Sequence, residues 1–430
     1  MSAAAIPLTA GIELPGPAVT QRARQAALAE LTAAGWPTRR REQWRYTDLE
    51  PLGAARFELV PAPADSAARE AAARLLRDPK LGDASQRLVL LDGRWSPELG
   101  VAAIAGLEVG DTESRWSEFE ARFARAAAAT HHPLAALNTA FMPPALWLRV
   151  PAGTKVAAPI HVVVVGSARA GLATQPRVVI DVQERAEVTV VQHFVDCAGA
   201  ATGWTNAVTQ LALATGARLA LYRFQAHDEQ RTHTSLLTAE LAADAELTAG
   251  YFDLGGRLVR NDVAIALQGV AARTDLSGVF LPGAGQHIDN HTTIRHAAGE
   301  TTSRESFRGI VGDRGRGVFN GRVVVEPGCQ RIDAQQRNDN LLLGEHAEID
   351  TKPELEIYAN DVKCSHGTTV GELDHEQLFY LTTRGLSAQE ARRLLTTAFA
   401  AVILERIGHD TLRRQATELV TAQLERLMEA

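Results

Sequence analysis

The chain has 430 residues, a formal net charge of −7 and 46% hydrophobic residues. This length exceeds one ordinary hydrophobic core and indicates two or three domains. The mild acidity gives no basic footprint for nucleic acid. No run of about 18 apolar residues predicts a membrane span, and the N-terminus lacks the basic start of a signal peptide. We therefore expect a chain that binds neither nucleic acid nor membrane.

The three cysteines, Cys197, Cys329 and Cys364, lie far apart in the sequence and form no C-x-x-C pair. An odd number of scattered cysteines argues against a disulfide framework. We expect reduced thiols and a cytoplasmic protein. Cys197 and Cys329 are interpreted as small apolar fillers of the core.

Residues 1–145 are expected to form an N-terminal, mainly helical domain. Alanine-rich, helix-periodic segments predict helices at 20–34, 65–76 and 117–129, and RLVLLDGRW at 87–95 predicts a strand and a turn. The segment REQWRYTDLEPL carries apolar side chains expected to dock on the remainder of the protein, namely Trp44, Leu49 and Leu52.

Residues 146–358 show short alternating β-type stretches and almost no helical periodicity. A turn pattern recurs at Ala186, Ala217, Ala245, Ala271, Gly299, Gly328 and Ala347, so that by subtraction the successive steps are 31, 28, 26, 28, 29 and 19. A drifting period of this size indicates a solenoid of stacked strands. The rival fold, a β-sandwich, predicts turns about every 8–12 residues without the longer recurrence.

Residues 359–430 are expected to hold one strand followed by helices. Ser387 and Glu390 form a capping box that opens a helix after Gly385. Its predicted apolar stripe is Leu394, Leu395, Ala398, Phe399, Val402 and Ile403. A second amphipathic helix follows Asp410. From the residues alone, the two helices either cap the open end of the solenoid or form a docking surface.

The motif KCSHG places Cys364 and His366 two positions apart, so both side chains share one face of an extended strand. A thiolate beside an imidazole is half of a soft metal or iron–sulfur site, because such sites normally take three or four protein ligands. The competing interpretation is two unrelated side chains on a strand.

Other motifs carry less chemistry. The sequence contains no G-x-x-x-x-G-K-[ST], so we expect no ATP hydrolysis by this chain. The histidines His287, His291 and His296 are interpreted as hydrogen-bonded residues of a solenoid wall rather than ligands. The pair His131 and His132, before a proline, predicts helix capping rather than metal binding.

Four segments together resemble the SufB/SufD family of iron–sulfur cluster assembly proteins: QHIDNHTTIRH (286–296), FRGIVGDRGRGVFNGRVVV (307–325), the block from 336 to 374 that contains KCSHG, and LFYLTTRGLSAQEARRLL (378–395). The segment REQWRYTDLEPL resembles the family's N-terminal signature. Within the family, KCSHGTTVGELD resembles the SufD-type arrangement rather than the SufB-type one.

The resemblance implies a right-handed parallel β-helix flanked by N- and C-terminal helical domains. It also implies a scaffold without catalysis of its own, pairing with SufB through the β-helix and with the ATPase SufC through the C-terminal helices. By this resemblance, His366 is a ligand of a nascent, transient iron–sulfur cluster at the SufB interface, and Cys364 is a second candidate ligand. Reduced flavin (FADH2) is implied as an electron source in the complex.

Three alternatives remain open from the sequence. The chain could be a SufB-like paralogue, or a homodimeric scaffold that works without SufB. A β-helix enzyme acting on polysaccharide would need clustered carboxylates along one face, whereas the candidates here are expected on scattered turns, at Asp313, Glu326, Asp333 and Asp339.

Overall fold

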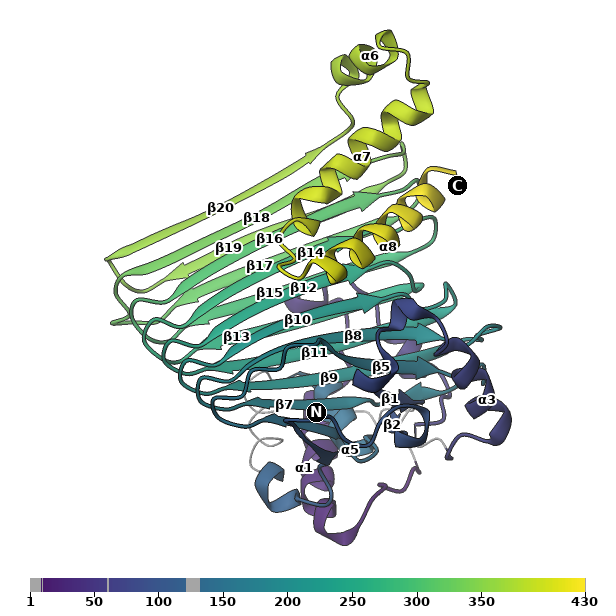
Figure 1. The fold of residues 1–430 in the computed structure, drawn as a ribbon, viewed down its shortest axis with the longest axis vertical. Coiled ribbons are helices and arrows are strands. Elements are labelled where there is room, and N and C mark those ends of the chain that lie inside the picture. The colour runs from purple at the N-terminus through teal and green to yellow at the C-terminus, as the bar shows by residue number, and fades with distance from the viewer. Residues whose placement is uncertain (1–8, 10, 60–61, 121–131, 430) are drawn as a thin grey trace.

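The computed structural model describes residues 9, 11–59, 62–120 and 132–429, and its centre is a stack of parallel β-coils (Figure 1). Each coil adds one strand to each of two facing sheets. The first sheet runs, in spatial order, β2 (Arg94–Trp95), β1 (Arg87–Leu91), β5 (Ile160–Gly166), β8 (Glu187–Asp196), β10 (Arg218–Gln225), β12 (Glu246–Asp253), β14 (Arg273–Phe280), β16 (Thr302–Val311), β18 (Ile332–Leu342) and β20 (Val362–Gly371).

The second sheet faces the first across the core. Its strands are, in spatial order, β19 (Glu348–Ile357), β17 (Arg316–Val325), β15 (His287–His296), β13 (Leu258–Leu267), β11 (Arg231–Leu241), β9 (Gly203–Leu213), β7 (Arg177–Val182), β4 (Leu146–Val150) and β3 (Glu108–Asp111), and the short β6 (Ala173–Thr174) pairs with β9. Pairing is parallel except for β1 with β2 and β3 with β4. The predicted parallel β-solenoid is confirmed.

The strand register reveals the true repeat. Residues at one position of the first sheet recur at steps of 31, 28, 27, 29, 31 and 30, by subtraction of Glu187, Arg218, Glu246, Arg273, Thr302, Asp333 and Lys363. Three of the predicted repeat positions, Ala186, Ala217 and Ala245, lie directly before these strands. The predicted last step, which ends at Ala347, is wrong, because Ala347 precedes β19 of the second sheet.

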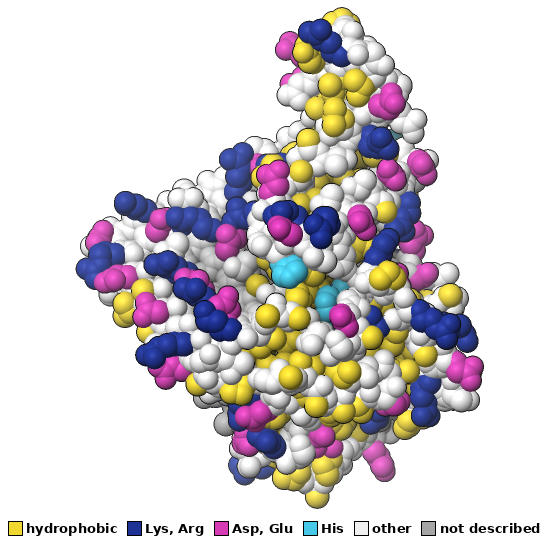
Figure 2. All heavy atoms as spheres, viewed as in Figure 1, with side chains coloured by type: hydrophobic (Ala, Val, Ile, Leu, Met, Phe, Trp, Pro, Cys, Tyr) yellow, Lys and Arg dark blue, Asp and Glu magenta, His cyan; other side chains and the backbone are white. Residues whose placement is uncertain are grey.

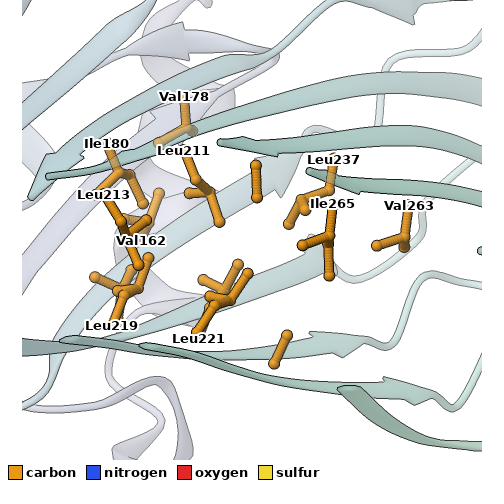
Figure 3. Close-up of a cluster of buried hydrophobic side chains, with 14 of the residues drawn as sticks. Val162, Val178, Ile180, Leu211, Leu213, Leu219, Leu221, Leu237, Val263 and Ile265 are labelled. Atoms are coloured by element: carbon orange, nitrogen blue, oxygen red, sulfur yellow. The ribbon is translucent and has the colours of Figure 1, made fainter. Parts of the chain in front are cut away.

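Small and branched side chains fill the space between the sheets. Every second residue of a strand points inward, and the inward residues from successive coils stack on one another. Figure 3 shows Val178, Leu211 and Ile265 from the second sheet meeting Val162 and Leu221 from the first. This continuous core explains how a chain with few aromatic residues buries enough surface, since each coil covers its neighbour.

The N-terminal region mixes helices with strands of the solenoid. Its helices are α1 (Ala18–Ala34), α2 (Glu50–Ala54), α3 (Ser66–Leu75) and α5 (Pro133–Phe141). The predicted helices at 20–34 and 65–76 and the strand and turn at 87–95 are confirmed, and most of the helix predicted at 117–129 lies outside the described residues. Strand β1 pairs with β5, so this part of the region belongs to the first sheet.

The segment REQWRYTDLEPL docks on the solenoid as predicted, because Trp44, Leu49 and Leu52 are all buried. Trp44 lies under the guanidinium of Arg260, which is 4.4 Å from the ring centre. Arg260 in turn pairs with Asp289 of β15 at 2.6 Å. A cation–π contact and a buried ion pair therefore fix the N-terminal segment to the outside of the second sheet.

Three helices follow the last strand: α6 (His375–Thr383), α7 (Ala388–Leu404) and α8 (Asp410–Glu429). The capping box of Ser387 and Glu390 is confirmed. Helices α7 and α8 lie across the outer face of the first sheet, where they pack on Tyr222, Phe252 and Ile310 (Figure 1). They do not cover the end of the solenoid.

The predicted apolar stripe of α7 is partly wrong. Leu394 and Val402 are exposed, whereas the helix buries Ala391, Thr396, Ala400, Ile403 and Leu404. The buried face is rotated from the predicted one because small residues let α7 approach the sheet closely, and this close packing outweighs the burial of two larger side chains.

Candidate functional site

Cys364 and His366 both lie on β20, the last strand of the first sheet, and both occupy inward positions. Cys364 pairs in register with Ala334 of β18, and His366 pairs with Gln336. Ala334 and Gln336 are buried in the interior. Side chains at paired positions of a sheet project to the same face. The two candidate ligands therefore share one face, as their spacing predicts, at the end of the solenoid formed by β19 and β20, which we call the mouth.

The mouth is open among the described residues. Strand β20 is the last strand of the first sheet and β19 the last of the second, so each has a neighbour on one side only. Their side chains are half-buried or exposed throughout, in contrast to the buried strands below them. Unpaired strand edges of this kind are ready to accept another chain.

Cys364 lies in the apolar half of the mouth. It packs against Val323, Cys329, Ile332 and Ala334. Burial raises the pKa of its thiol above the ordinary value, against the opposing effect of a backbone hydrogen bond from Ala334. The thiol is therefore protonated near neutral pH, and iron binding would have to displace that proton.

His366 lies in the polar half of the mouth and is exposed to solvent. Its neighbours on the interior side are polar: Thr368 bonds Thr351 at 3.0 Å, and Thr351 donates to Asn338 at 2.8 Å. An exposed imidazole in a polar rim keeps a ring nitrogen available as a metal ligand.

Within the described part of the chain, Cys364 and His366 are not joined by a complete set of metal ligands. Across the residues that the structure describes, no group of three or more His, Cys, Asp or Glu side chains could hold a metal ion. The mouth thus offers two donors of the types that bind iron–sulfur clusters.

The three histidines interpreted as part of the solenoid wall have polar neighbours. His296 is buried between the hydroxyls of Thr301 and Ser303, at 2.7 and 2.9 Å. His291 pairs with Asp289 at 3.0 Å, and His287 lies 3.3 Å from the Thr47 hydroxyl. The interpretation as a hydrogen-bonded wall is confirmed for His287 and His296, whereas His291 lies beside a carboxylate.

His132 caps the start of α5, accepting a hydrogen bond from the backbone of Ala135, whereas the sequence placed the histidine pair at the end of the helix predicted at 117–129. Its neighbour His131 lies outside the described residues. The cysteines Cys197 and Cys329 are buried in apolar clusters, which confirms that they are core fillers. All three cysteines are free thiols.

Among the four candidate carboxylates, Asp333 and Asp339 are paired with arginines. Asp333 and Asp339 lie within β18, not on turns as expected from the sequence. Asp333 pairs with Arg304 at 2.5 Å and Asp339 with Arg337 at 2.7 Å. Carboxylates occupied by arginines on the outer face are unsuited to the paired acid–base chemistry of polysaccharide cleavage.

Two residues behind His366 were not expected from the sequence. Glu305 and Gln336 are buried polar side chains at inward positions of β16 and β18, in the same register column as His366. The three positions are separated by one solenoid repeat each, since Glu305 pairs with Gln336 and Gln336 with His366 on successive coils. Aligning the repeats could therefore have found them.

One further surface stands out on α6. Phe379 and Tyr380 are 71% and 56% exposed. Figure 2 shows hydrophobic side chains gathered on this projecting helix, which Figure 1 places beyond the stack of strands. Two neighbouring exposed aromatic side chains are typical of a protein interaction site.

In the described residues, no helix has the length and apolar character needed to cross a membrane.

Comparison with known families matches residues 164–399 to the core domain of the SufB and SufD proteins of the SUF system for iron–sulfur cluster assembly.

The chain is also similar to individual proteins over nearly its whole length. It is 34% identical to iron–sulfur cluster assembly protein SufD of Escherichia coli, covering 94% of both chains. It is 30% identical to the SufBD family protein slr0076 of Synechocystis, covering 93% of this chain and 90% of the relative. SufD of Bacillus subtilis is 25% identical over 67% of this chain and 66% of the relative. The chain belongs to the SufB/SufD family of iron–sulfur cluster assembly proteins.

Proposed function

We propose that this chain is a SufD-like scaffold subunit that helps to build an iron–sulfur cluster and pass it to acceptor proteins. The observation that carries the proposal is the position of Cys364 and His366 on the inward face of the last, uncovered coil. The cluster is cargo, held transiently between this chain and a SufB-like partner seated on the open mouth. In the proposed site His366 is a ligand from this chain and Cys364 a second candidate.

We call a cluster site whose ligands come from two chains a split site. Such a site explains why each chain alone has an incomplete set of ligands. A cluster that must be released is better held at an interface that can open than in a closed cage within one chain, because separation of the chains then removes ligands. A SufB-like partner would supply cysteine and an acidic ligand. Movement driven by a SufC-like ATPase would open and close the interface, so that ATP hydrolysis belongs to that partner and this chain is a non-catalytic scaffold.

The C-terminal helices are the proposed docking site of the SufC-like ATPase. Helices α7 and α8 are fixed to the first sheet, whereas α6 projects with Phe379 and Tyr380 exposed. In this proposal α6 binds the ATPase through its exposed aromatic side chains, and the packed helices α7 and α8 transmit the movement of the ATPase to the first sheet. We therefore place the ATPase on α6 and the adjoining part of α7.

A reduced flavin in the complex is part of the proposal as an electron source. Two hollows on the described surface have volumes of about 500 and 480 Å³, one beside Arg260 and Lys352 and one beside His366. Neither is lined by Phe, Tyr or Trp, so histidine imidazoles are the rings that these two hollows offer for stacking on an isoalloxazine.

Cluster assembly on the complex tests the proposal. This chain is co-expressed with SufB and SufC homologues, clusters are reconstituted without oxygen, and iron content and absorption are compared among wild type, His366→Ala, Cys364→Ala and the control Ser365→Ala. Ser365 lies between the two candidates but points outward. We expect His366→Ala to lower the cluster yield while the complex still assembles, with Ser365→Ala unchanged.

Equal yields in all variants would refute the split site. Light scattering on this chain prepared without the SufB homologue shows whether it forms a homodimer. A homodimer that is loaded with cluster under these conditions would favour the homodimeric scaffold instead.

A further inference from the structure

Glu305, Gln336 and His366 form one column along the inner wall of the first sheet. Glu305 of β16 pairs in register with Gln336 of β18, and Gln336 pairs with His366 of β20. Neighbouring strands lie about 4.8 Å apart and their paired side chains project to the same face. Gln336 is therefore the side chain that separates the exposed His366 from the buried Glu305.

Glu305 holds one end of the Gln336 amide. The Gln336 Nε2 group donates a hydrogen bond of 2.7 Å to Glu305 Oε2. Burial raises the pKa of the Glu305 carboxyl to about 7, and the hydrogen bond from Gln336 opposes that rise. Above this pH the carboxylate can only accept hydrogen bonds, so the amide must turn its NH2 group toward Glu305.

Gly321 of β17, in the facing sheet, provides the space for this amide. A Cβ atom at Gly321 would overlap Gln336 Nε2. The Gln336 side chain thus reaches across the interior and touches the opposite wall where a side chain is missing. Contacts on both walls restrict the amide to one orientation.

The other end of the amide is unused. Gln336 Oε1 is buried and has no hydrogen-bond partner among the described residues. Buried carbonyl oxygens nearly always have a partner. The neighbour at the next position of the column is His366, whose ring carries N–H groups or an N–H and a free nitrogen according to its protonation.

We propose that Gln336 is a positioning residue for His366: its Oε1 accepts a hydrogen bond from one ring N–H of His366 and leaves the other ring nitrogen facing the mouth. The inference rests on the proposed function in that the free nitrogen is the one that binds the cluster. A metal-bound histidine generally donates its second N–H to an oxygen, which fixes its tautomer and ring orientation. Glu305 and Gly321 contact Gln336 and fix the orientation of its amide.

The hydrogen bond is tested on this chain alone, without iron or partner. Ring N–H signals are recorded at pH 8 on protein labelled with 15N-histidine, and the His366 signal is assigned by its loss in His366→Ala. A ring N–H that is exposed and unbonded exchanges with water too fast to be seen. We expect a visible His366 signal in wild type and its loss in Gln336→Leu.

Matched variants separate this role from a structural one. Gln335→Leu makes the same substitution on the outer face of β18 and should keep the signal. The exchanged pair Glu305→Gln with Gln336→Glu retains one amide donor and one carboxylate, restores an acceptor beside His366 and should recover the signal. Gln336→Met provides the test should the leucine variant fail to fold. No His366 signal in wild type, or a signal that survives loss of the Gln336 oxygen, would overturn the inference.

Iron content in the reconstituted complex distinguishes failure of this inference from failure of the proposed function. Changes to the partners of metal-bound histidines typically cost about 10-fold or more in metal affinity, so Gln336→Leu should weaken cluster retention about 10-fold and the exchanged pair Glu305→Gln with Gln336→Glu much less. An effect of His366→Ala without any effect of Gln336→Leu would refute the positioning role alone. A ring hydrogen bond with no effect of either variant on the cluster would refute the function instead.

Discussion

Cys364 and His366 stand two positions apart on the same face of β20, yet their surroundings differ: the thiol packs into an apolar cluster, and the imidazole is exposed in a polar rim. The two halves of the mouth therefore suit different tasks. An exposed imidazole can bind metal without rearrangement, whereas the thiol must first lose a proton that its surroundings help to retain.

The first prediction concerns the reactivity of Cys364. Because burial raises the pKa of its thiol, the reactive thiolate is scarce at neutral pH and increases as the pH rises. We expect iodoacetamide to modify Cys364 slowly at pH 7 and much faster above pH 9, as followed by mass spectrometry.

The other two cysteines serve as internal controls. Cys197 and Cys329 are buried, and the pKa of Cys197 is raised to about 11 by burial. Both should react with iodoacetamide more slowly than Cys364 at every pH at which the protein stays folded. Modification of Cys364 at pH 7 as fast as that of a free thiol in solution would contradict the packing described here.

The second prediction concerns α6 as the ATPase docking site. Truncation of an aromatic anchor at an interface commonly costs about 2 kcal/mol or more, so Phe379→Ala should weaken binding of a SufC homologue by about 30-fold in calorimetry. Gln377→Ala, an exposed polar change on the same helix, should leave binding nearly unchanged. Since Phe379 is largely exposed, thermal stability should not fall, and equal affinities for both variants would exclude α6 from the interface.

The third prediction compares two faces of α7. Ile403 is fully buried against the first sheet, whereas Leu394 is half exposed. Ile403→Ala should lower the free energy of unfolding by about 2–5 kcal/mol because it leaves a cavity. Leu394→Ala should change it by less than about 0.5 kcal/mol. Urea unfolding measures both, and equal losses would mean that α7 packs by the face expected from the sequence.

The fourth prediction concerns pH. His161 and His193 are buried on the first sheet, with His161 Nδ1 3.0 Å from His193 Nε2. Burial lowers the pKa of His161 to about 4 and that of His193 to about 3, well below the ordinary 6.5. The unfolded chain therefore binds protons first as the pH falls.

The stability contributed by this pair should thus be complete above pH 6.5 and decline as the pH falls toward 4. The expected slope is about 1.4 kcal/mol per pH unit for each histidine. Urea midpoints between pH 7 and pH 5 measure it, with His193→Phe expected to flatten the dependence and the exposed control His346→Gln to leave it intact. A midpoint unchanged over this range in wild type would show that the pair is not buried in neutral form.

Most of the fold was predictable because each coil of a solenoid carries the same local sequence pattern. Alternating strands, small residues such as Ala186 and Ala217 at tight turns, and a recurrence in the range typical of solenoid coils are all local signals. The capping box at Ser387 and the docking side chain Trp44 were equally readable, since each depends on a few neighbouring residues.

What escaped prediction depends on three-dimensional packing. Which face of α7 is buried is decided by how closely Ala391 and Ala400 let it approach the sheet, and helical periodicity fits either face. The pair of Cys364 and His366 was visible as a motif, but the column of Glu305 and Gln336 behind His366 emerges only when the strands of successive coils are brought into register. The domain boundaries at residues 145 and 358 stay predictions.

The most direct test of the split site asks whether a histidine of this chain touches the cluster. The complex is assembled from this chain labelled with 15N-histidine and unlabelled partners, the cluster is reduced, and nitrogen couplings are recorded by pulsed electron paramagnetic resonance. The account predicts a directly bound 15N coupling that disappears in His366→Ala. A cluster whose spectrum is identical with labelled and unlabelled chains would contradict it, because His366 would then not be a ligand.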